Sequence, residues 1–134
     1  MTTKSAGREL ILVVDEVEET RDAIEKLLTA DGYRVSASRD EQDAIERGRR
    51  QPPELILMSR GAGSADAVAT VRRIRDHATL DRTVPVVIFC DETIAEGAEM
   101  DIGENTHLTH PDNFDQLRRL VRRLLHQFPS LLCG

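Results

Sequence analysis

Four segments of this 134-residue chain that have the pattern of β-strands lead into side chains capable of chemistry. Two carboxylates follow the first segment, a hydroxyl ends the second, a thiol ends the third and an imidazole follows the last. Adjacent carboxylates can hold a divalent cation, a hydroxyl can be phosphorylated and a thiol can be oxidised. These five residues are Asp15, Glu16, Ser59, Cys90 and His110.

The segments that must position these residues are apolar without interruption. The run from Leu10 to Val14 is continuous rather than alternating, which is typical of a strand buried on both faces of a parallel sheet. Strands are predicted at 10–14, 33–38, 55–59, 86–90 and 107–109. Helices are predicted at 18–29, 41–50, 66–77 and 91–102, with a long amphipathic helix after Pro111. The weakest pattern is that of 91–102, which contains Gly97, many acids and few large apolar residues.

Strands that alternate with helices predict an α/β fold. We expect a three-layer sandwich with a five-stranded parallel sheet in the flavodoxin-like order 2-1-3-4-5. The functional crevice of such a sheet lies beyond the carboxyl ends of its strands, where the five side chains fall. We expect one domain over residues 10–128, between short tails at 1–9 and 129–134.

Composition excludes several classes of protein. The net charge is 18 − 24 = −6, which argues against nucleic acid as the main partner. No apolar run approaches the roughly 20 residues that cross a bilayer, and the polar start lacks a signal-peptide core. The two cysteines form no metal-ligand pattern. We therefore expect a cytoplasmic protein that binds neither nucleic acid nor membrane.

Six segments together resemble the receiver domain of bacterial response regulators. The resemblance extends from about Leu10 to Leu125, and it rests on the joint order and spacing of the segments. It implies a CheY-like fold and a phosphorelay, in which a histidine kinase passes a phosphoryl group to a receiver aspartate beside Mg²⁺. The segments are ILVVDE, LLTADGYRV, PELILMS, VRRIR, VPVVIFC and HLTHP.

The chain departs from the family pattern at most functional positions. The acceptor aspartate is expected at the end of the third strand, where this chain has Ser59. The hydroxyl after the fourth strand, the lysine before the proline and the switch aromatic on the last strand are also replaced. Cys90, His110 and His107 hold these positions, whereas Asp15 and Glu16 retain the acidic pair.

These departures predict an atypical receiver. A side chain without a carboxylate cannot become an acyl phosphate, so we expect a stand-alone pseudo-receiver that acts by protein–protein contact and is not an enzyme. No Ser-His-Asp spacing, P-loop or nucleotide fingerprint is present. Two acids make a poor Mg²⁺ site, so metal binding at Asp15 and Glu16 is expected to be weak and vestigial, and no cofactor is expected.

Each singled-out residue also has a structural interpretation. Asp15 and Glu16 could cap the following helix, and Ser59 could relieve repulsion between carboxylates. Ser59 phosphorylation or Cys90 oxidation would make the chain a switch of another chemical class. Cys90 is otherwise a small buried hydrophobe. His107 and His110 are expected on opposite faces of their strand, which disfavours a shared metal.

The last helix carries a basic face. It could dock an acidic protein partner, such as a histidine kinase or a downstream effector, or a second copy in a homodimer. Alternatively it is a solvated face near a helix C-terminus, where cations are favoured. Its residues are Arg118, Arg119, Arg122 and Arg123.

Overall fold

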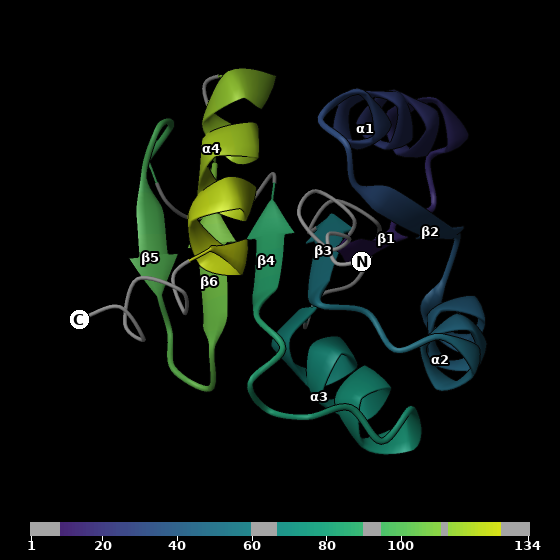
Figure 1. The fold of residues 1–134 in the computed structure, drawn as a ribbon. Coiled ribbons are helices and arrows are strands. Elements are labelled where there is room, and N and C mark those ends of the chain that lie inside the picture. The colour runs from purple at the N-terminus through teal and green to yellow at the C-terminus, as the bar shows by residue number, and fades with distance from the viewer. Residues whose placement is uncertain (1–8, 60–66, 90–94, 111–112, 127–134) are drawn as a thin grey trace.

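The computed structural model of the chain describes residues 9–59, 67–89, 95–110 and 113–126. These residues form six strands and four helices (Figure 1). In chain order they are β1 (Leu10–Val14), α1 (Glu18–Ala30), β2 (Arg34–Ser38), α2 (Glu41–Arg50), β3 (Leu55–Ser59), α3 (Ala67–His77), β4 (Val86–Phe89), β5 (Glu99–Asp101), β6 (Thr106–Thr109) and α4 (Phe114–Leu125).

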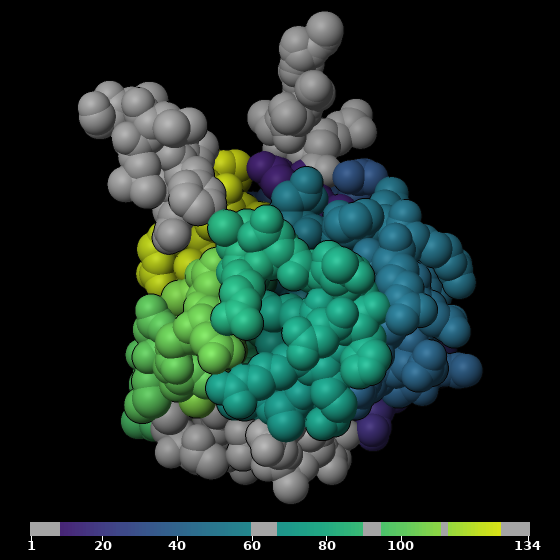
Figure 2. Space-filling model, turned by 90° about the horizontal axis from the view of Figure 1, so that it is seen from below, coloured from purple at the N-terminus to yellow at the C-terminus, as the bar shows by residue number. Residues whose placement is uncertain are grey.

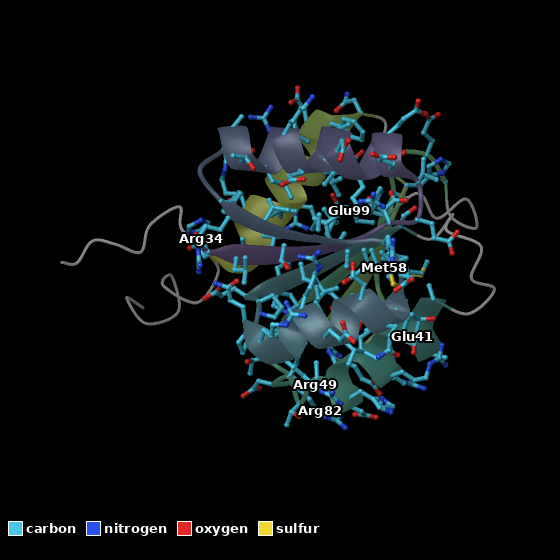
Figure 3. The ribbon with its side chains drawn as sticks, turned by 90° about the vertical axis from the view of Figure 1, so that its right-hand side faces the viewer. Arg34, Glu41, Arg49, Met58, Arg82 and Glu99 are labelled. Carbon is cyan, nitrogen blue, oxygen red and sulfur yellow. The ribbon has the colours of Figure 1, made fainter. Side chains whose placement is uncertain are left out.

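The strands make one sheet in the order β2-β1-β3-β4-β6-β5, and all neighbours except β5 and β6 are parallel. Helices α1 and α4 cover one face, and α2 and α3 cover the other (Figures 1 and 3). This arrangement confirms the predicted α/β sandwich of flavodoxin-like type. The parallel part of the sheet has the predicted order, with β6 as its fifth strand.

The core follows from the apolar strand runs. Every residue of β1 and β3 is buried, because each strand has neighbours on both sides and helices on both faces. Leu57 and Val87 pack toward α1 and α4, whereas Leu12 and Ile56 pack toward α2 and α3. Gly48 brings α2 close to α3, since a Cβ atom there would lie 3.2 Å from the Cβ of Ala78.

The predicted helix over 91–102 is wrong for the part that the structure describes. Residues 99–101 form β5, which pairs with β6 in a hairpin. Gly97 and Gly103, with φ of +85° and +93°, lie just before and just after β5, and neither conformation belongs to a helix. Residues 91–94 lie outside the described segments. The sheet therefore has a sixth, antiparallel strand, and no described helix lies between β4 and β5.

A side chain of α3 and a backbone carbonyl of the loop that follows it hold the turn of this hairpin. Glu104 and Asn105 are left-handed, with φ of 56° and 57°. The buried guanidinium of Arg75 donates to the carbonyl oxygens of Glu104 and Val84, each at 2.7 Å. Asn105 Nδ2 donates to the carbonyl of Thr83 at 2.8 Å. Figure 2 shows the green hairpin at the margin of the molecule, beside the teal residues of α3.

Candidate functional site

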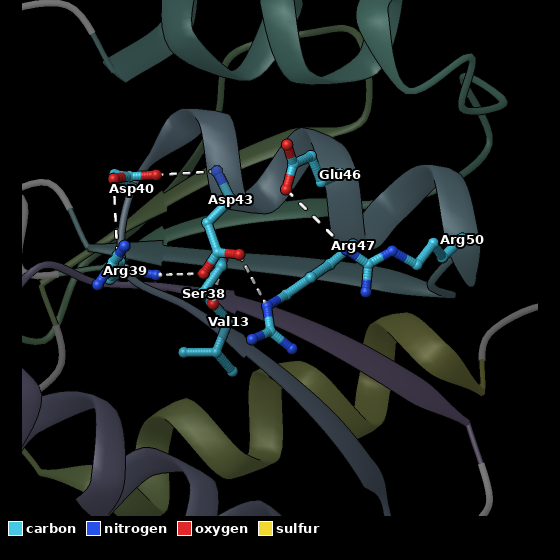
Figure 4. A network of polar contacts seen from close by, with 8 residues as sticks. All are labelled: Val13, Ser38, Arg39, Asp40, Asp43, Glu46, Arg47 and Arg50. Atoms are coloured by element: carbon cyan, nitrogen blue, oxygen red, sulfur yellow. Dashed lines mark hydrogen bonds and ion pairs between the residues drawn. The ribbon is translucent and has the colours of Figure 1, made fainter.

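The end of β1 is fixed by β2. Asp15, which is only 1% exposed, donates its backbone N–H to the carbonyl of Ser38 at 3.0 Å. The buried Ser38 hydroxyl donates to the carbonyl of Val13 at 2.8 Å (Figure 4). Ser38 thus binds the backbone of both Val13 and Asp15, the residues on either side of Val14. Sequence reasoning missed this role, for which the only signal is a small polar residue at the end of a strand.

A network of polar contacts surrounds the connection between Ser38 and α2 (Figure 4). Asp40 caps the helix by accepting the Asp43 N–H at 2.8 Å. The Asp43 carboxylate accepts from the Arg39 backbone at 3.3 Å and from Arg47 Nε at 3.1 Å. These bonds stabilise the β2–α2 connection that flanks the end of β1.

The Asp15 carboxyl group is only half satisfied. Its Oδ1 accepts the Val17 N–H at 2.9 Å, while its Oδ2 is buried with no partner among the described residues. Burial raises the pKa of Asp15 above its ordinary value, and the Val17 N–H and Arg21 oppose this rise. Glu16 is exposed. Neither acid caps α1, because the N-cap is Val17, which makes no side-chain capping bond.

Ser59 lies beside Asp15. The register that pairs Val14 with Met58 places these next two residues side by side at the strand ends. Ser59 also pairs with Phe89 of β4, and it is 7% exposed. Cys90 would follow Phe89, but it lies outside the described residues. The structure therefore brings Asp15 and Ser59 together at the carboxyl edge of the sheet.

The two histidines of the last strand have different surroundings. His107 is partly buried, and its Nε2 has no partner within the described segments. Burial lowers the pKa of His107, Arg123 lowers it further, and Asp101 and Glu99 oppose the change. His110 follows β6, and its backbone is tied to the turn before β5: its N–H donates to Ala98 at 3.2 Å.

The chain is similar to known proteins in both sequence and fold. The chain matches the response regulator receiver domain over residues 11–122. It belongs to the response regulator receiver domain family. The receiver domain of the sensor histidine kinase PA1611 from Pseudomonas aeruginosa, solved with magnesium in its active-site cleft, superposes with a TM-score of 0.65. That structure is 26% identical and covers 88% of this chain and 98% of its own.

Curated relatives of this receiver domain are longer proteins. The transcriptional regulatory protein KdpE of Staphylococcus aureus is 25% identical over 84% of this chain and 48% of its own length. The response regulator PleD of Caulobacter vibrioides is 31% identical over 85% of this chain and 25% of its own length. The chain thus spans half or less of these regulators. In the segments that the structure describes, no helix is long and apolar enough to cross a membrane.

The four arginines of the receiver's last helix are not equivalent. Arg118 binds both Asp31, at the C-terminal end of α1, and Asp115. Arg123 binds Glu99 of β5 at 2.8 Å. Arg122 lies beside the phenol of Tyr33, whose pKa is raised chiefly by burial. The guanidinium of Arg119 is exposed and has no partner among the described residues.

The PA1611 receiver domain holds magnesium in its active-site cleft, so the oxygen donors at the strand ends of this chain bear on whether Mg²⁺ fits here. Mg²⁺ prefers near-octahedral oxygen coordination and is commonly held by one or two carboxylates together with phosphate oxygens and water. Asp15 Oδ2 is an unpartnered buried oxygen and Glu16 is a second acid, but β3 contributes the neutral hydroxyl of Ser59. Within the described segments, no three acidic, histidine or cysteine side chains cluster as metal ligands. These residues do not fit the metal chemistry of a phosphoryl-accepting site.

Proposed function

We propose that this receiver domain relays its two-component signal through protein–protein contact, without forming an aspartyl phosphate. The proposal rests on one observation: the residue that ends β3 beside Asp15 is Ser59, which has no carboxylate. Its partner is a histidine kinase or a downstream effector in the cytoplasm. The functional domain extends over residues 10–128, and the rim of Asp15, Glu16, Ser59, Cys90 and His110 is a degenerate acceptor pocket.

The chemistry at the strand ends supports this proposal. An acyl phosphate requires a carboxylate that attacks phosphorus. Asp15 is a poor substitute, because its Oδ1 is bonded to Val17 and burial raises its pKa, which favours the neutral form. Ser59 would need a general base to become nucleophilic, and its burial opposes access by a Ser/Thr kinase.

Intact-mass measurement after incubation with acetyl phosphate and Mg²⁺ tests the proposal. We expect no phosphoryl adduct on the wild-type chain. Ser59→Asp restores a carboxylate at the end of β3 and is the matched variant, for which we expect an adduct that hydroxylamine removes. A hydroxylamine-sensitive adduct on the wild-type protein would show that another aspartate accepts the phosphoryl group, and the proposal would then be abandoned.

A further inference from the structure

We propose that the open edge of β5 binds an extended segment of a partner protein. This segment is apolar where it meets Met100 and carries a carboxylate where it meets Arg119. The inference goes beyond the proposed function, because it concerns the opposite end of the sheet from β1 and is independent of the chemistry at Ser59.

The hydrogen-bonding pattern of the hairpin leaves this edge open. The Ile102 N–H donates to Thr106, and the His110 N–H donates to Ala98. Hydrogen-bonded pairs alternate along an antiparallel ladder, so Glu99 and Asp101 occupy the positions between such pairs. The backbone N–H and C=O groups of Glu99 and Asp101 therefore point away from β6. An added strand would find four backbone partners there.

On one face of the hairpin, the β5 half presents apolar side chains to solvent. All three residues of β5 are exposed. Met100 is 48% exposed and Ile102 is 38% exposed, so they are among the large apolar side chains most open to solvent. Met100 pairs with Leu108, which belongs to the cluster under α2 and α3. An apolar side chain on an added strand would extend this cluster past the edge of the sheet.

Beside the other face of β5, α4 supplies a positive charge that has no partner among the described residues. A hollow of about 480 Å³ lies between β5 and α4, lined by Gly97, Glu99, Asn113, Gln116, Arg119 and Arg123. Glu99 already has partners of its own, because Arg123 donates to it at 2.8 Å and Gln116 donates at 3.4 Å. Arg119 remains without a partner among the described residues, so charge complementarity favours a carboxylate on the incoming segment.

A second copy of the chain fits this edge poorly. Antiparallel pairing of two β5 strands around Met100 would place Glu99 of one copy opposite Asp101 of the other. Like charges directly opposite each other destabilise a sheet. A foreign segment can place its carboxylate opposite Arg119 and uncharged residues opposite Glu99 and Asp101, which the fixed sequence of a second β5 cannot do. We therefore assign the edge to such a partner.

Selection from a phage-displayed library of random short peptides on the full chain tests the assignment. We expect the selected peptides to combine apolar residues with a single Asp or Glu. Asp101→Pro removes an outward N–H and should weaken their binding at least about tenfold, a difference that is easily measured. Asp101→Thr is the matched control, because it loses the same carboxylate but keeps the N–H, and it should retain binding.

A second pair of variants examines the charge. Arg119→Glu should weaken binding by a similar factor, whereas Arg82→Glu, a charge reversal on the exposed α2–α3 side (Figure 3), should not. Unfolding curves establish that each variant is folded. The proposal fails if no peptide is selected, if the peptides are basic, or if they bind Asp101→Pro as well as Asp101→Thr. It also fails if sedimentation shows a wild-type dimer that Asp101→Pro dissociates, because a second copy would then be the occupant.

Discussion

Strands β3 and β5 differ in how they are held. All five residues of β3 are buried between two strands and two helical layers, whereas all three residues of β5 are exposed. The β5–β6 hairpin is tied to the domain by polar contacts from Arg75 and Arg123. The comparison indicates that apolar burial stabilises the receiver core, while specific polar bonds define the far edge. A substitution at the edge should therefore change the surface with little cost to the fold.

The largest expected effect is on the free energy of unfolding, which should depend on whether the replaced side chain is buried in β3 or exposed in β5. Leu57→Ala removes a fully buried side chain in the middle of β3 and should lower the free energy of unfolding by about 3 kcal/mol. Met100→Ala, at the centre of β5, should lower it by less than about 0.5 kcal/mol because the side chain is half exposed. Urea unfolding monitored by circular dichroism measures both. Equal costs would contradict the division into a buried core and a solvated edge.

Loss of the hydrogen bonds that attach the hairpin to α3 should have the second largest effect on stability. Arg75→Ala leaves the carbonyls of Glu104 and Val84 without their donor and should cost about 2 kcal/mol. The loss should be local, so hydrogen exchange of the hairpin amides should accelerate more than exchange in β1 and β3. Arg72→Ala is the matched control: Arg72 lies on the same helix, but its contact with the Glu104 carboxylate is exposed and should contribute less than about 0.5 kcal/mol. A uniform increase in exchange across the sheet would argue against a local tie.

The same division explains which elements the sequence could predict. The boundaries of β1, α2 and β3 follow from uninterrupted apolar runs and from breakers such as Pro52 and Pro53. The hairpin could not be predicted in this way. Its short strand is polar, and its left-handed turn depends on Arg75, which belongs to a helix far away in the sequence. Long-range side-chain bonds of this kind leave no periodic signal.

The candidate site was predictable to a similar extent. The adjacency of Asp15 and Ser59 follows from the strand register, which pairs the preceding residues Val14 and Met58. Ser38 was missed because its partner, the Val13 carbonyl, lies on another strand. The different bonding of Arg118 and Arg119 was missed because it depends on Asp31, which is brought near by packing of α1 against the same face as α4.

Replacing the Asp15 carboxyl group should have a smaller effect, and it should raise the free energy of unfolding rather than lower it. Burial raises its pKa in the folded state, so the folded protein binds the proton more tightly than the unfolded chain does. Stability from this group is present at low pH and is lost as pH rises from about 4 through the folded-state pKa. Asp15→Asn keeps an oxygen for the Val17 N–H and should stabilise the domain at pH 7 by about 1 kcal/mol.

Unfolding curves measured over a range of pH show whether Asp15→Asn stabilises the domain because the Asp15 carboxyl group is buried or because the protein loses one negative charge. The stabilisation by Asp15→Asn should shrink as pH falls toward about 4, where the wild-type carboxyl group becomes protonated. Glu16→Gln removes the neighbouring, exposed acid and should change stability by less than about 0.5 kcal/mol. If both variants stabilise equally at pH 7, long-range charge rather than burial of Asp15 is responsible.

The smallest effect returns to the hairpin and concerns His107. Burial lowers its pKa in the folded state, so the unfolded chain binds more protons once pH falls below about 6.5. Its contribution to stability is complete above that pH and is lost as pH decreases toward the folded-state pKa. His107→Phe removes the titration, so the stability of wild type relative to this variant should fall by up to about 1 kcal/mol between pH 7.5 and 5. The facing charges, Asp101 and Glu99 on β5 and Arg123 on α4, are retained in both proteins. A constant difference across this range would mean that the imidazole keeps its ordinary pKa, and that the hairpin leaves this face of β6 open to water.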